Sequence, residues 1–514
     1  MILKRGQAQR KATTFLFRLF YPSLLVAMLA GYGIGISACS AQVCNQTSLP
    51  AVTIAPDGTG VQRFTVSGKP FVPVGVNYMI EGHGTYNGSS YQTFDMFDTQ
   101  NFNITTIDSS MASIAQNGFT YVRLWLKGID TDNGFSSPNA WNKYVTNIVA
   151  TIQDAEKYGL HVVLTGSFPG PTGTGFMPTN YAPSASSIPS NVAGMNQLLL
   201  VPAEGQALGQ FYNNLLTAML AIDPKIASDI FYFDIYNELH YDLNAAPLSS
   251  NTGTFTFLGV TYNLNDFSSN DLADPTSRQA LMDVAAQYFV QVVGGQIRAA
   301  MPNLYLTPSS YYNHAFNHAG YDGGLLLAES TNNYAMRPYY VLQGGANLID
   351  IHNYPSSTFN TSAALASNEI ITAATTPTGT LISAKIAPLI SGEFGEETSG
   401  YVINGDTYIQ GLEAAITEML STESSVYCGY SYTGFAVWEW NDIPSDTFVL
   451  IDPTNDPSGL LLHATAPLYN PQFCGQTVTA NSAQKVAPMN TQTATPMNTV
   501  KKGTQAGVLN LYLQ

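Results

Sequence analysis

Two acidic residues stand where strongly apolar runs of the sequence end. The segment 231–238 reads FYFDIYNE and finishes in Asn237 and Glu238, and the segment 388–393 reads PLISGE and finishes in Glu393. A carboxylate at the end of a buried strand needs a partner or a function, because burying an unpaired charge is costly. These two glutamates are therefore the strongest candidates for chemistry in the chain.

A facing pair of carboxylates is the arrangement that hydrolysis of a glycosidic bond requires. One carboxyl group protonates the leaving oxygen, and the other attacks the anomeric carbon when the two groups lie about 5–5.5 Å apart. The sequence contains no G-x-S-x-G, P-loop or H-E-x-x-H motif, so esterase, nucleotide-dependent and metalloprotease chemistry lack support. We expect no metal ion and no organic cofactor.

Eight runs of apolar and β-branched residues alternate with longer helical patterns, which predicts βα units and a parallel sheet. Their nearly continuous apolar composition is typical of strands buried on both faces. The expected strands are Phe71–Tyr78, Thr120–Leu126, His161–Ser167, Phe231–Glu238, Leu304–Ser310, Leu348–Tyr354, Pro388–Phe394 and Gly434–Trp440. The expected helices are Ser110–Asn117, Trp141–Tyr158, Gly205–Ile222, Arg278–Ala300 and Tyr408–Ser421, the first two ending at Gly118 and Gly159.

Eight such units predict an α/β fold, namely a (β/α)8 TIM barrel with long βα-loop insertions. An open doubly wound sheet is the alternative, but no G-x-G-x-x-G follows the first expected strand. The insertions 81–109, 168–203 and 240–276 follow strands one, three and four, where a barrel keeps its active site. Glu238 and Glu393 would end strands four and seven and face each other at that end.

The composition indicates a folded chain with a neutral ligand. Of the 514 residues, 45% are hydrophobic and only 11% are charged, and the formal net charge is −16. This acidic balance argues against nucleic acid or an anionic membrane surface as a partner. We expect a monomer that binds a neutral ligand, and the family resemblance given below implies a β-linked oligo- or polysaccharide.

The N-terminus has the pattern of an export signal. Basic residues precede an apolar stretch that ends in small residues near Ala38, so residues 1–38 are predicted to be a signal peptide. Cleavage after Ala41 and lipidation of Cys39, within a lipobox-like sequence, both remain open. The protein is accordingly expected to be secreted or at the cell surface, with a membrane contact only through a lipid anchor at Cys39.

The remainder of the chain divides into three parts. Residues 42–70 are predicted to form a hairpin that closes the barrel, residues 71–474 the barrel itself, and residues 475–514 a low-complexity, disordered tail. Because export implies an oxidising compartment, Cys428 and Cys474 can form a disulfide, although the sequence does not fix the pairing.

Several motifs, in order along the chain, resemble glycoside hydrolase clan A, and family 5 most of all. The resemblance covers about residues 62–445. Asn237-Glu238 resembles the pair that ends strand four in that clan, and Glu393 the residue that ends strand seven. The other matching residues are Asn77 in GVNY, Arg123 in VRLW, His352 and Tyr354 in HNY, and Trp438 in FAVW.

The resemblance implies a retaining β-glycoside hydrolase with Glu238 as acid/base and Glu393 as nucleophile. Arg123 and Tyr354 would hold the nucleophile, Asn237 and His352 would contact sugar hydroxyls, and Asn77 and Trp438 would belong to the substrate site. The Pro that follows Asn-Glu in many members is replaced here by Leu239, which weakens the assignment to a subfamily.

Several functions remain open at this stage. We expect endo action on a β-glucan or β-mannan, because long loops rich in Tyr and Asn suit an extended cleft. An exo-β-glycosidase and a transglycosylase are alternatives within the clan. A non-catalytic, glycan-binding surface lipoprotein on a barrel scaffold is the alternative from another class, since the fold hosts many functions.

Overall fold

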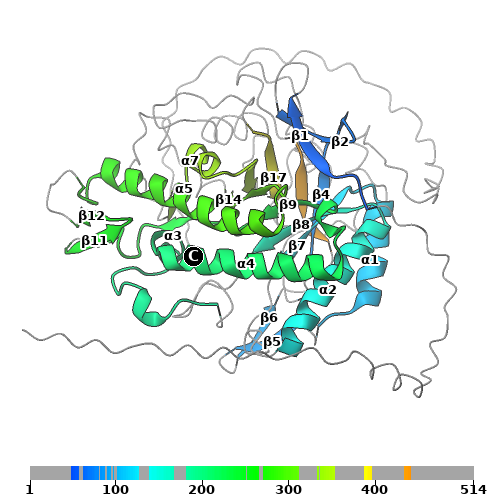
Figure 1. Cartoon of the computed structure of the whole chain (residues 1–514), viewed down its shortest axis with the longest axis horizontal. Coiled ribbons are helices and arrows are strands. Elements are labelled where there is room, and N and C mark those ends of the chain that lie inside the picture. The colour runs from blue at the N-terminus through cyan, green and yellow to red at the C-terminus, as the bar shows by residue number, and fades with distance from the viewer. Residues whose placement is uncertain are drawn as a thin grey trace, which may run out of the picture. The chain divides into compact units, whose positions relative to one another are not determined.

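The structure is a computed structural model (Figure 1). It describes a part of the chain between Ser48 and Trp440, with gaps, and the account below concerns these residues only. The described residues are 48–56, 62–79, 82–86, 89–93, 96–97, 101–126, 138–166, 181–250, 252–264, 270–311, 333–334, 336–352, 387–395 and 433–440.

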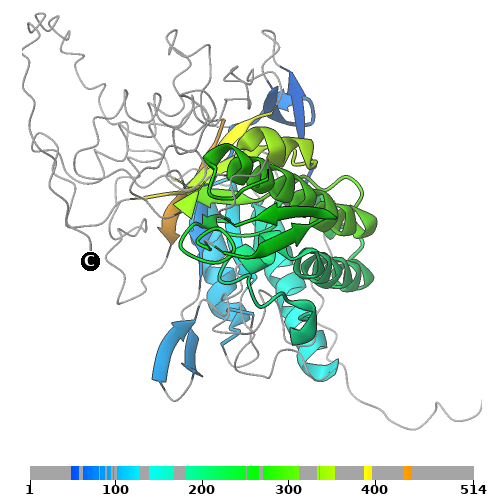
Figure 2. The ribbon, with the colours of Figure 1, turned by 90° about the vertical axis from the view of Figure 1, so that its left-hand side faces the viewer.

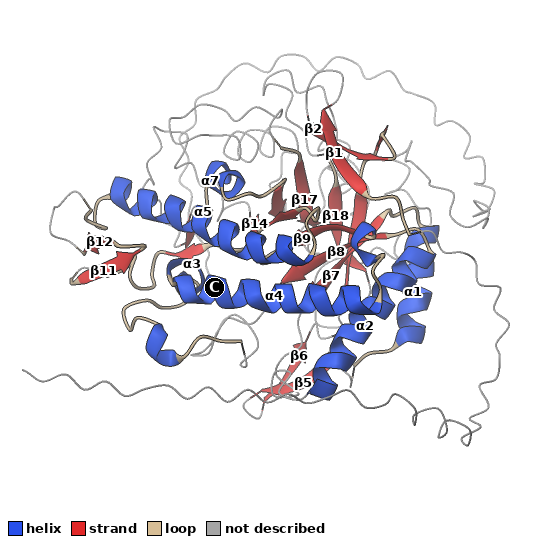
Figure 3. Cartoon of the chain, in the orientation of Figure 1, coloured by secondary structure: helices blue, strands red, loops and turns tan. Residues whose placement is uncertain are grey.

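Parallel strands form a nearly closed barrel at the centre of the described chain (Figure 3). In chain order they are β4 (Val74–Tyr78), β7 (Tyr121–Leu126), β8 (His161–Gly166), β9 (Ile230–Asp234), β13 (Leu306–Thr307) with β14 (Ser309–Tyr311), β16 (Ile349–His352), β17 (Leu389–Phe394) and β18 (Phe435–Trp440). Strand β13 pairs with β9 and β14 pairs with β16, so β13 and β14 act as one fifth strand interrupted at Pro308. Strand β18 pairs with β4, so one continuous sheet runs nearly all the way round, and its two ends are the consecutive strands β13 and β14. The predicted TIM barrel is confirmed.

Helices follow each of the first five strands. They are α1 (Ile104–Gln116), α2 (Pro138–Lys157), α3 (Asn196–Leu200) with α4 (Pro202–Ile222), α5 (Pro275–Ala300) and α7 (Pro338–Gln343). Helices α4 and α5 lie side by side against the sheet (Figure 1). The connections after β16, β17 and β18 lie outside the described residues, and so does the predicted helix 408–421.

Most predicted element boundaries are close to the observed ones, but the start of one helix and the end of one strand differ clearly. Helix α1 begins at Ile104 instead of Ser110, because the side chain of Asn103 accepts a hydrogen bond from the Thr106 amide and caps the helix there. Strand β9 ends at Asp234 instead of Glu238. As predicted, Gly118 and Gly159 follow helices α1 and α2, with φ angles of 86° and 80° that favour glycine.

The long insertions contain small elements that the sequence patterns did not predict. Strands β5 (Gly82–Tyr86) and β6 (Ser89–Thr93) form a hairpin that extends away from the barrel strands (Figure 2). After β9, β11 (Thr254–Phe257) and β12 (Val260–Asn263) form a second hairpin. The pair β10 (Tyr241–Asp242) and β15 (Asn333–Tyr334) links two insertions.

A short antiparallel sheet lies at the N-terminal ends of the barrel strands, which we call the floor. It consists of β1 (Val52–Pro56), β2 (Gln62–Val66) and β3 (Lys69–Pro70). Its buried residues Val52, Phe64 and Val66 belong to one apolar cluster with the barrel residues Tyr121, Val163, Phe231, Tyr232, Leu348, Ile390 and Ala436. The hairpin therefore covers the floor with apolar side chains.

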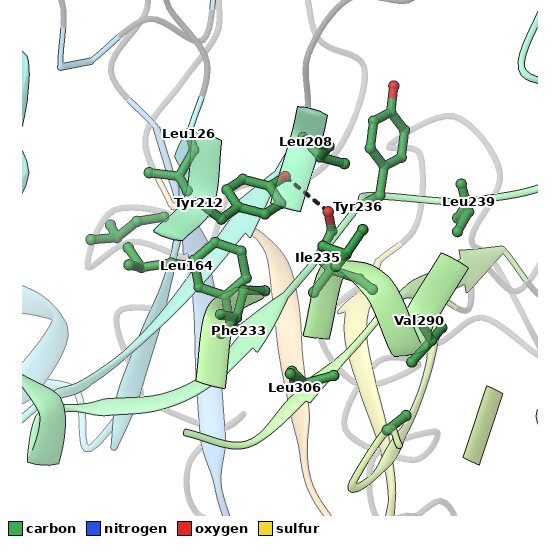
Figure 4. Packing of buried hydrophobic residues seen from close by; sticks show 14 of the residues in the cluster. Leu126, Leu164, Leu208, Tyr212, Phe233, Ile235, Tyr236, Leu239, Val290 and Leu306 are labelled. Atoms are coloured by element: carbon green, nitrogen blue, oxygen red, sulfur yellow. Dashed lines mark hydrogen bonds between the residues drawn. The ribbon is translucent and has the colours of Figure 1, made fainter. Parts of the chain in front are cut away.

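A larger apolar core lies between the strands and the surrounding helices, and it also fixes the exit of β9 (Figure 4). Tyr212 of α4 packs against Phe233, and its hydroxyl donates a 2.9 Å hydrogen bond to the carbonyl of Ile235. A Cβ on Gly166, at the end of β8, would lie 1.9 Å from that hydroxyl oxygen. Only glycine allows this contact, which holds the chain just before Glu238.

Other sequence predictions also fall outside the described residues. They concern the signal peptide of residues 1–38, the four cysteines including Cys39, Cys428 and Cys474, and the tail of residues 475–514. Among the helices that the structure describes, none combines the length and the apolar character needed to span a bilayer.

Candidate active site

Glu238 lies at the C-terminal ends of the barrel strands, which we call the mouth. Beyond β9 the backbone stays bonded to both neighbouring strands, since the Ile235 amide donates to Thr307 at 2.9 Å and the Asn237 amide donates to Gly166 at 2.7 Å. Glu238 then adopts a left-handed backbone with φ of 50°, a conformation that costs a non-glycine residue energy and is found at functional sites. Its side chain is one-third exposed.

The fifth strand anchors Glu238. The Glu238 amide donates to the hydroxyl of Ser309 at 3.1 Å, and the next amide, of Leu239, donates to the Ser309 carbonyl at 2.9 Å. Two consecutive amides are thus satisfied by one residue of β14, which compensates for the unfavourable backbone angle of Glu238.

Glu393 approaches the same place from the opposite side of the barrel. It is the fifth residue of β17, and its side chain is 4% exposed. Its Oε1 accepts a hydrogen bond from Nη1 of Arg123 at 2.6 Å. A buried carboxylate with this contact is ionised and held in one orientation.

Arg123, in the middle of β7, is fully buried and connects four side chains. Its Nη1 donates to Glu393 and to Oδ1 of Asn77 at 2.9 Å. Its Nη2 donates to Asp234 at 2.8 Å and to Oδ1 of Asn237 at 2.7 Å. The guanidinium is thus shared between the carboxylates of Glu393 and Asp234 instead of forming a bidentate pair with Glu393 alone.

The two asparagines of the predicted site have different surroundings. Asn77 is buried, and its Nδ2 donates to the carbonyls of Gly392 and Val437 at 3.0 and 3.3 Å. It therefore ties β4 to β17 and β18 and orients Arg123. Asn237 is half-buried and presents its oxygen to Arg123, so its amide nitrogen is the atom that can donate to a ligand.

His352, the last residue of β16, lies between the two glutamates. Its Nδ1 is 3.1 Å from Oε1 of Glu238 and 3.3 Å from Oε2 of Glu393, and the ring is fully buried. Burial alone would lower the pKa of His352, but the charge of Glu393 and the hydrogen bonds to both glutamates raise it from 6.5 to about 10. His352 is therefore an imidazolium at neutral pH, and its Nδ1 faces an oxygen of each glutamate.

The pKa of Arg123 is also raised by the carboxylates around it. Burial opposes the charged guanidinium, but the negative charges of Glu393, Asp234 and Asp350 outweigh it and raise the pKa above its ordinary value. The buried charges at the mouth are therefore paired, as buried charges must be to persist.

The two glutamates lie close enough to act on one bond. A carboxylate oxygen of Glu238, one of Glu393 and a ring nitrogen of His352 all lie within 4.8 Å of one another. This spacing fits the roughly 5–5.5 Å between carboxyl groups in glycosidases that retain the anomeric configuration, and it is shorter than the roughly 6.5–9.5 Å of those that invert it.

Two groups of side chains could in principle supply three ligands to a metal ion. One is Glu238, His352 and Glu393, and the other is Asp234, Asp350 and His352. Arg123 lies 2.8 Å from Asp234 and 2.6 Å from Glu393, so a metal cation in either group would be repelled by a guanidinium. The donor set fits protons and hydrogen bonds better than a metal ion.

Tryptophans lie beside the charged residues. Trp438 of β18 is 8% exposed, and its ring meets that of Trp125 edge to face at 5.5 Å. The guanidinium of Arg123 stacks on Trp125, with its central carbon 4.7 Å from the ring centre. Trp440, by contrast, packs against Phe119 in the outer core.

The structure brings together seven of the eight predicted site residues, and the eighth, Tyr354, lies outside the described residues. Three partners of these residues were missed by the sequence reasoning, namely Asp234, Asp350 and Ser309. The two aspartates had a detectable signal. Both interrupt apolar strand sequences, and a buried carboxylate requires partners wherever it stands in a strand.

Comparisons with known proteins give a limited result. No protein-family model and no curated protein matches the sequence. Similar solved structures include an exo-β-1,4-mannosidase from Opitutaceae bacterium strain TAV5, at 16% identity and a TM-score of 0.48, covering 80% of this chain. The chain spans only 62% of the length of that mannosidase.

Two further similar structures are shorter proteins. The endo-1,4-β-mannanase from Rhizomucor miehei is 14% identical with a TM-score of 0.48, and 80% of this chain covers 98% of it. The β-mannanase from the blue mussel Mytilus edulis is 16% identical with a TM-score of 0.45, and 82% of this chain covers 99% of it.

Proposed function

We propose that this protein is a retaining β-glycoside hydrolase that acts by double displacement, with Glu393 as nucleophile and Glu238 as acid/base. One observation carries the proposal: carboxylate oxygens from the ends of strands four and seven lie within 4.8 Å of each other. Their surroundings differ in the way that the two roles require. Glu393 is buried against Arg123, whereas Glu238 is one-third exposed.

In the first step, an oxygen of Glu393 attacks the anomeric carbon as the bond to the leaving oxygen breaks. The carboxyl proton of Glu238 passes to that oxygen, so a glycosyl ester of Glu393 and a free alcohol are formed. Arg123 keeps Glu393 ionised before the attack, because a protonated carboxyl could not accept its hydrogen bond at 2.6 Å as favourably.

In the second step, Glu238 acts as a base. It takes a proton from water, whose oxygen attacks the anomeric carbon, and the ester bond to Glu393 breaks. Two inversions leave the product with the original β configuration. Asn237 supports both steps, because its amide nitrogen can donate to the sugar 2-hydroxyl, a contact that strengthens in the transition state.

The substrate that we propose is a neutral β-linked polysaccharide, a β-glucan or β-mannan, cleaved at internal bonds. The net charge of −16 disfavours an acidic polymer. Trp438 offers a flat apolar face that suits the C–H face of a pyranose. Exo action and transglycosylation by the same two residues are the alternatives that product analysis distinguishes.

The proposal is tested by hydrolysis of β-glucans, β-mannans and aryl β-glycosides with the protein and its Glu393→Gln and Glu238→Ala variants. Glu393→Gln should lower kcat by at least about 10³-fold with the fold intact, since no nucleophile remains. Glu238→Ala should retain turnover of dinitrophenyl glycosides, whose leaving group needs no acid, and added azide should accelerate it. The azide product should have the β configuration.

The matched control is Asp108→Asn, which removes a surface carboxylate paired with Lys157 on the outer helices and should leave kcat unchanged. Unaltered turnover in Glu393→Gln would overturn the assignment of the nucleophile. If the protein bound glycans but cleaved none of these substrates, it would be the non-catalytic glycan-binding protein instead. A product of α configuration would exclude retention.

A further inference from the structure

Asp350 lies one layer below the two glutamates inside the barrel. It precedes His352 by two residues on β16, so both side chains project from the same face of the strand. The residue is 2% exposed. Its Oδ2 accepts a 2.8 Å hydrogen bond from the hydroxyl of Tyr232 on β9, and its Oδ1 accepts a 2.6 Å hydrogen bond from the amide of Gly392 on β17.

The bond to Gly392 connects Asp350 to the backbone of Glu393. Gly392 directly precedes Glu393, and a Cβ on Gly392 would lie only 2.4 Å from Oδ2 of Asp350. The glycine is therefore required for the carboxylate to reach the amide. Because that amide is held, the residue that follows it has little freedom to shift along or around the strand.

Asp350 is also near the charge of His352. Side-chain atoms of Asp350, Asp234 and His352 lie within 4.8 Å of one another. While Nδ1 of His352 faces the two glutamates, its Nε2 is buried with no hydrogen-bond partner among the residues that the structure describes. Negative charge near the ring favours the imidazolium form, which carries a proton on both nitrogens.

The titratable groups around His352 come from four strands. Glu238 and Asp234 come from β9 and the residues that follow it, Glu393 from β17, Arg123 from β7 and Asp350 from β16 itself. Burial raises the pKa of Asp350 to about 6, and the positive charges of His352 and Arg123 oppose this rise. Among the effects that favour the ionised form of Asp350, the positive charge of His352 is the largest.

We propose that Asp350 is a positioning residue for the reaction: its carboxylate fixes the backbone before Glu393, and its negative charge adds to that of Glu393 in favouring the protonated form of His352. The role of Asp350 in turnover rests on the function proposed above, whereas its effect on the charge of His352 does not. The two parts can therefore be measured separately.

The charge effect is measured by NMR titration of protein labelled with ¹³C-histidine. The chain has seven histidines, and the His352 signal is identified by its loss in His352→Asn. In Asp350→Asn, which keeps the shape and an oxygen for the Gly392 amide, the His352 midpoint should fall by roughly one pH unit or more. Asp350→Ser, which also removes the charge, should give the same downward shift if the asparagine variant does not fold.

The positioning effect is measured on the best aryl glycoside. Asp350→Asn should lower kcat about tenfold or more with little change in KM, the pattern of a lost transition-state contact. Its rate should also decline at a lower pH on the alkaline side than that of the wild-type protein. Tyr232→Phe is the matched control, because it removes one hydrogen bond from Asp350 and leaves the charge, and it should change neither the His352 midpoint nor the pH profile.

The outcomes separate the two proposals. An unchanged His352 midpoint together with an unchanged kcat in Asp350→Asn would overturn the role of Asp350. A lower kcat with an unmoved midpoint and an unmoved pH profile would reject the charge effect. If the wild-type protein hydrolysed no glycoside, the proposed function would fail, and the titration would still decide whether Asp350 controls the charge of His352.

Discussion

The mouth and the floor of the barrel both bury titratable side chains, but the charged forms are stabilised at the mouth and disfavoured at the floor. At the mouth, Arg123 and His352 contact Glu393 and stay protonated. At the floor, Asp229 precedes β9 and accepts a 3.0 Å hydrogen bond from the amide of Leu49, and His161 begins β8. Burial raises the pKa of Asp229 to about 7 and lowers that of His161 to about 4.

The difference between the two ends separates chemistry from architecture. Burial disfavours a charged form unless an opposite charge compensates for it. At the floor the neutral forms of Asp229 and His161 are favoured, and neutral polar groups suffice to join the N-terminal segment to the strands. At the mouth the charged forms are retained through a network of partners, which identifies the mouth as the place where charge has a use.

The largest expected effect comes from removing the cation of the mouth. Arg123→Met should lower the free energy of unfolding by about 3–5 kcal/mol, because Asp234 and Glu393 would remain buried without their partner. Denaturant unfolding at pH 7 measures this loss. The control is Lys157→Met, whose exposed ion pair with Asp108 should contribute about 0–1 kcal/mol. A loss below about 1 kcal/mol in Arg123→Met would mean that the network at the mouth is not a set of compensating charges.

At the floor, a substitution of Asp229 should raise the free energy of unfolding instead of lowering it. The folded protein holds a proton on Asp229 up to about pH 7, whereas the unfolded chain releases it near pH 4. The stability that this proton contributes is complete below the unfolded pKa and is lost as the pH rises through the folded one. Asp229→Asn has no such loss, so it should become more stable than the wild-type protein between pH 4 and pH 8, by about 2–4 kcal/mol.

Denaturant unfolding of the wild-type protein and of Asp229→Asn across this pH range measures the difference between their free energies of unfolding. The pH dependence that His161 contributes is common to both proteins and cancels in this difference. Asp108→Asn is a control of opposite sign, since the hydrogen bond from Lys157 lowers the pKa of Asp108 and favours the wild-type protein as the pH rises. A flat difference curve for Asp229→Asn would show that Asp229 is ionised at the floor as well.

The smallest expected effect tests whether the two ends are independent. The hydroxyl of Tyr305 accepts a 3.0 Å hydrogen bond from the amide of Ile54 and so ties the N-terminal hairpin to the barrel. Tyr305→Phe should cost about 1 kcal/mol of stability, the usual contribution of one hydrogen bond, and leave kcat on a glycoside unchanged. A fall in kcat of more than about threefold would show that the floor influences the mouth.

The barrel was predictable because each strand is buried on both faces, so its sequence is apolar almost throughout. Glu238 and Glu393 were predictable for the converse reason, since each ends such a run. The end of β9 was not, because the residues after Asp234 remain hydrogen-bonded to both neighbouring strands and keep the composition of a strand. Asp234 and Asp350 could be recognised as carboxylates within apolar strands, but a sequence does not reveal which buried side chains they meet across a barrel.

Other features depend on contacts that no local pattern encodes. The left-handed backbone of Glu238 is stabilised by Ser309, which is far from it in the sequence. The sharing of Arg123 between Asp234 and Glu393 depends on side chains from three strands. The roles of the site residues, the export signal, the cysteine pairing and the tail stay predictions.

The backbone supports of the two glutamates come from different strands. The amide of Glu238 is hydrogen-bonded to Ser309 of the fifth strand. The backbone before Glu393 is hydrogen-bonded instead to Asn77 of the first strand and Asp350 of the sixth. A substitution at position 309 acts directly on the backbone of Glu238 and leaves the backbone contacts before Glu393 intact. The spacing of the two carboxylates thus depends on two sets of backbone contacts that can be altered one at a time.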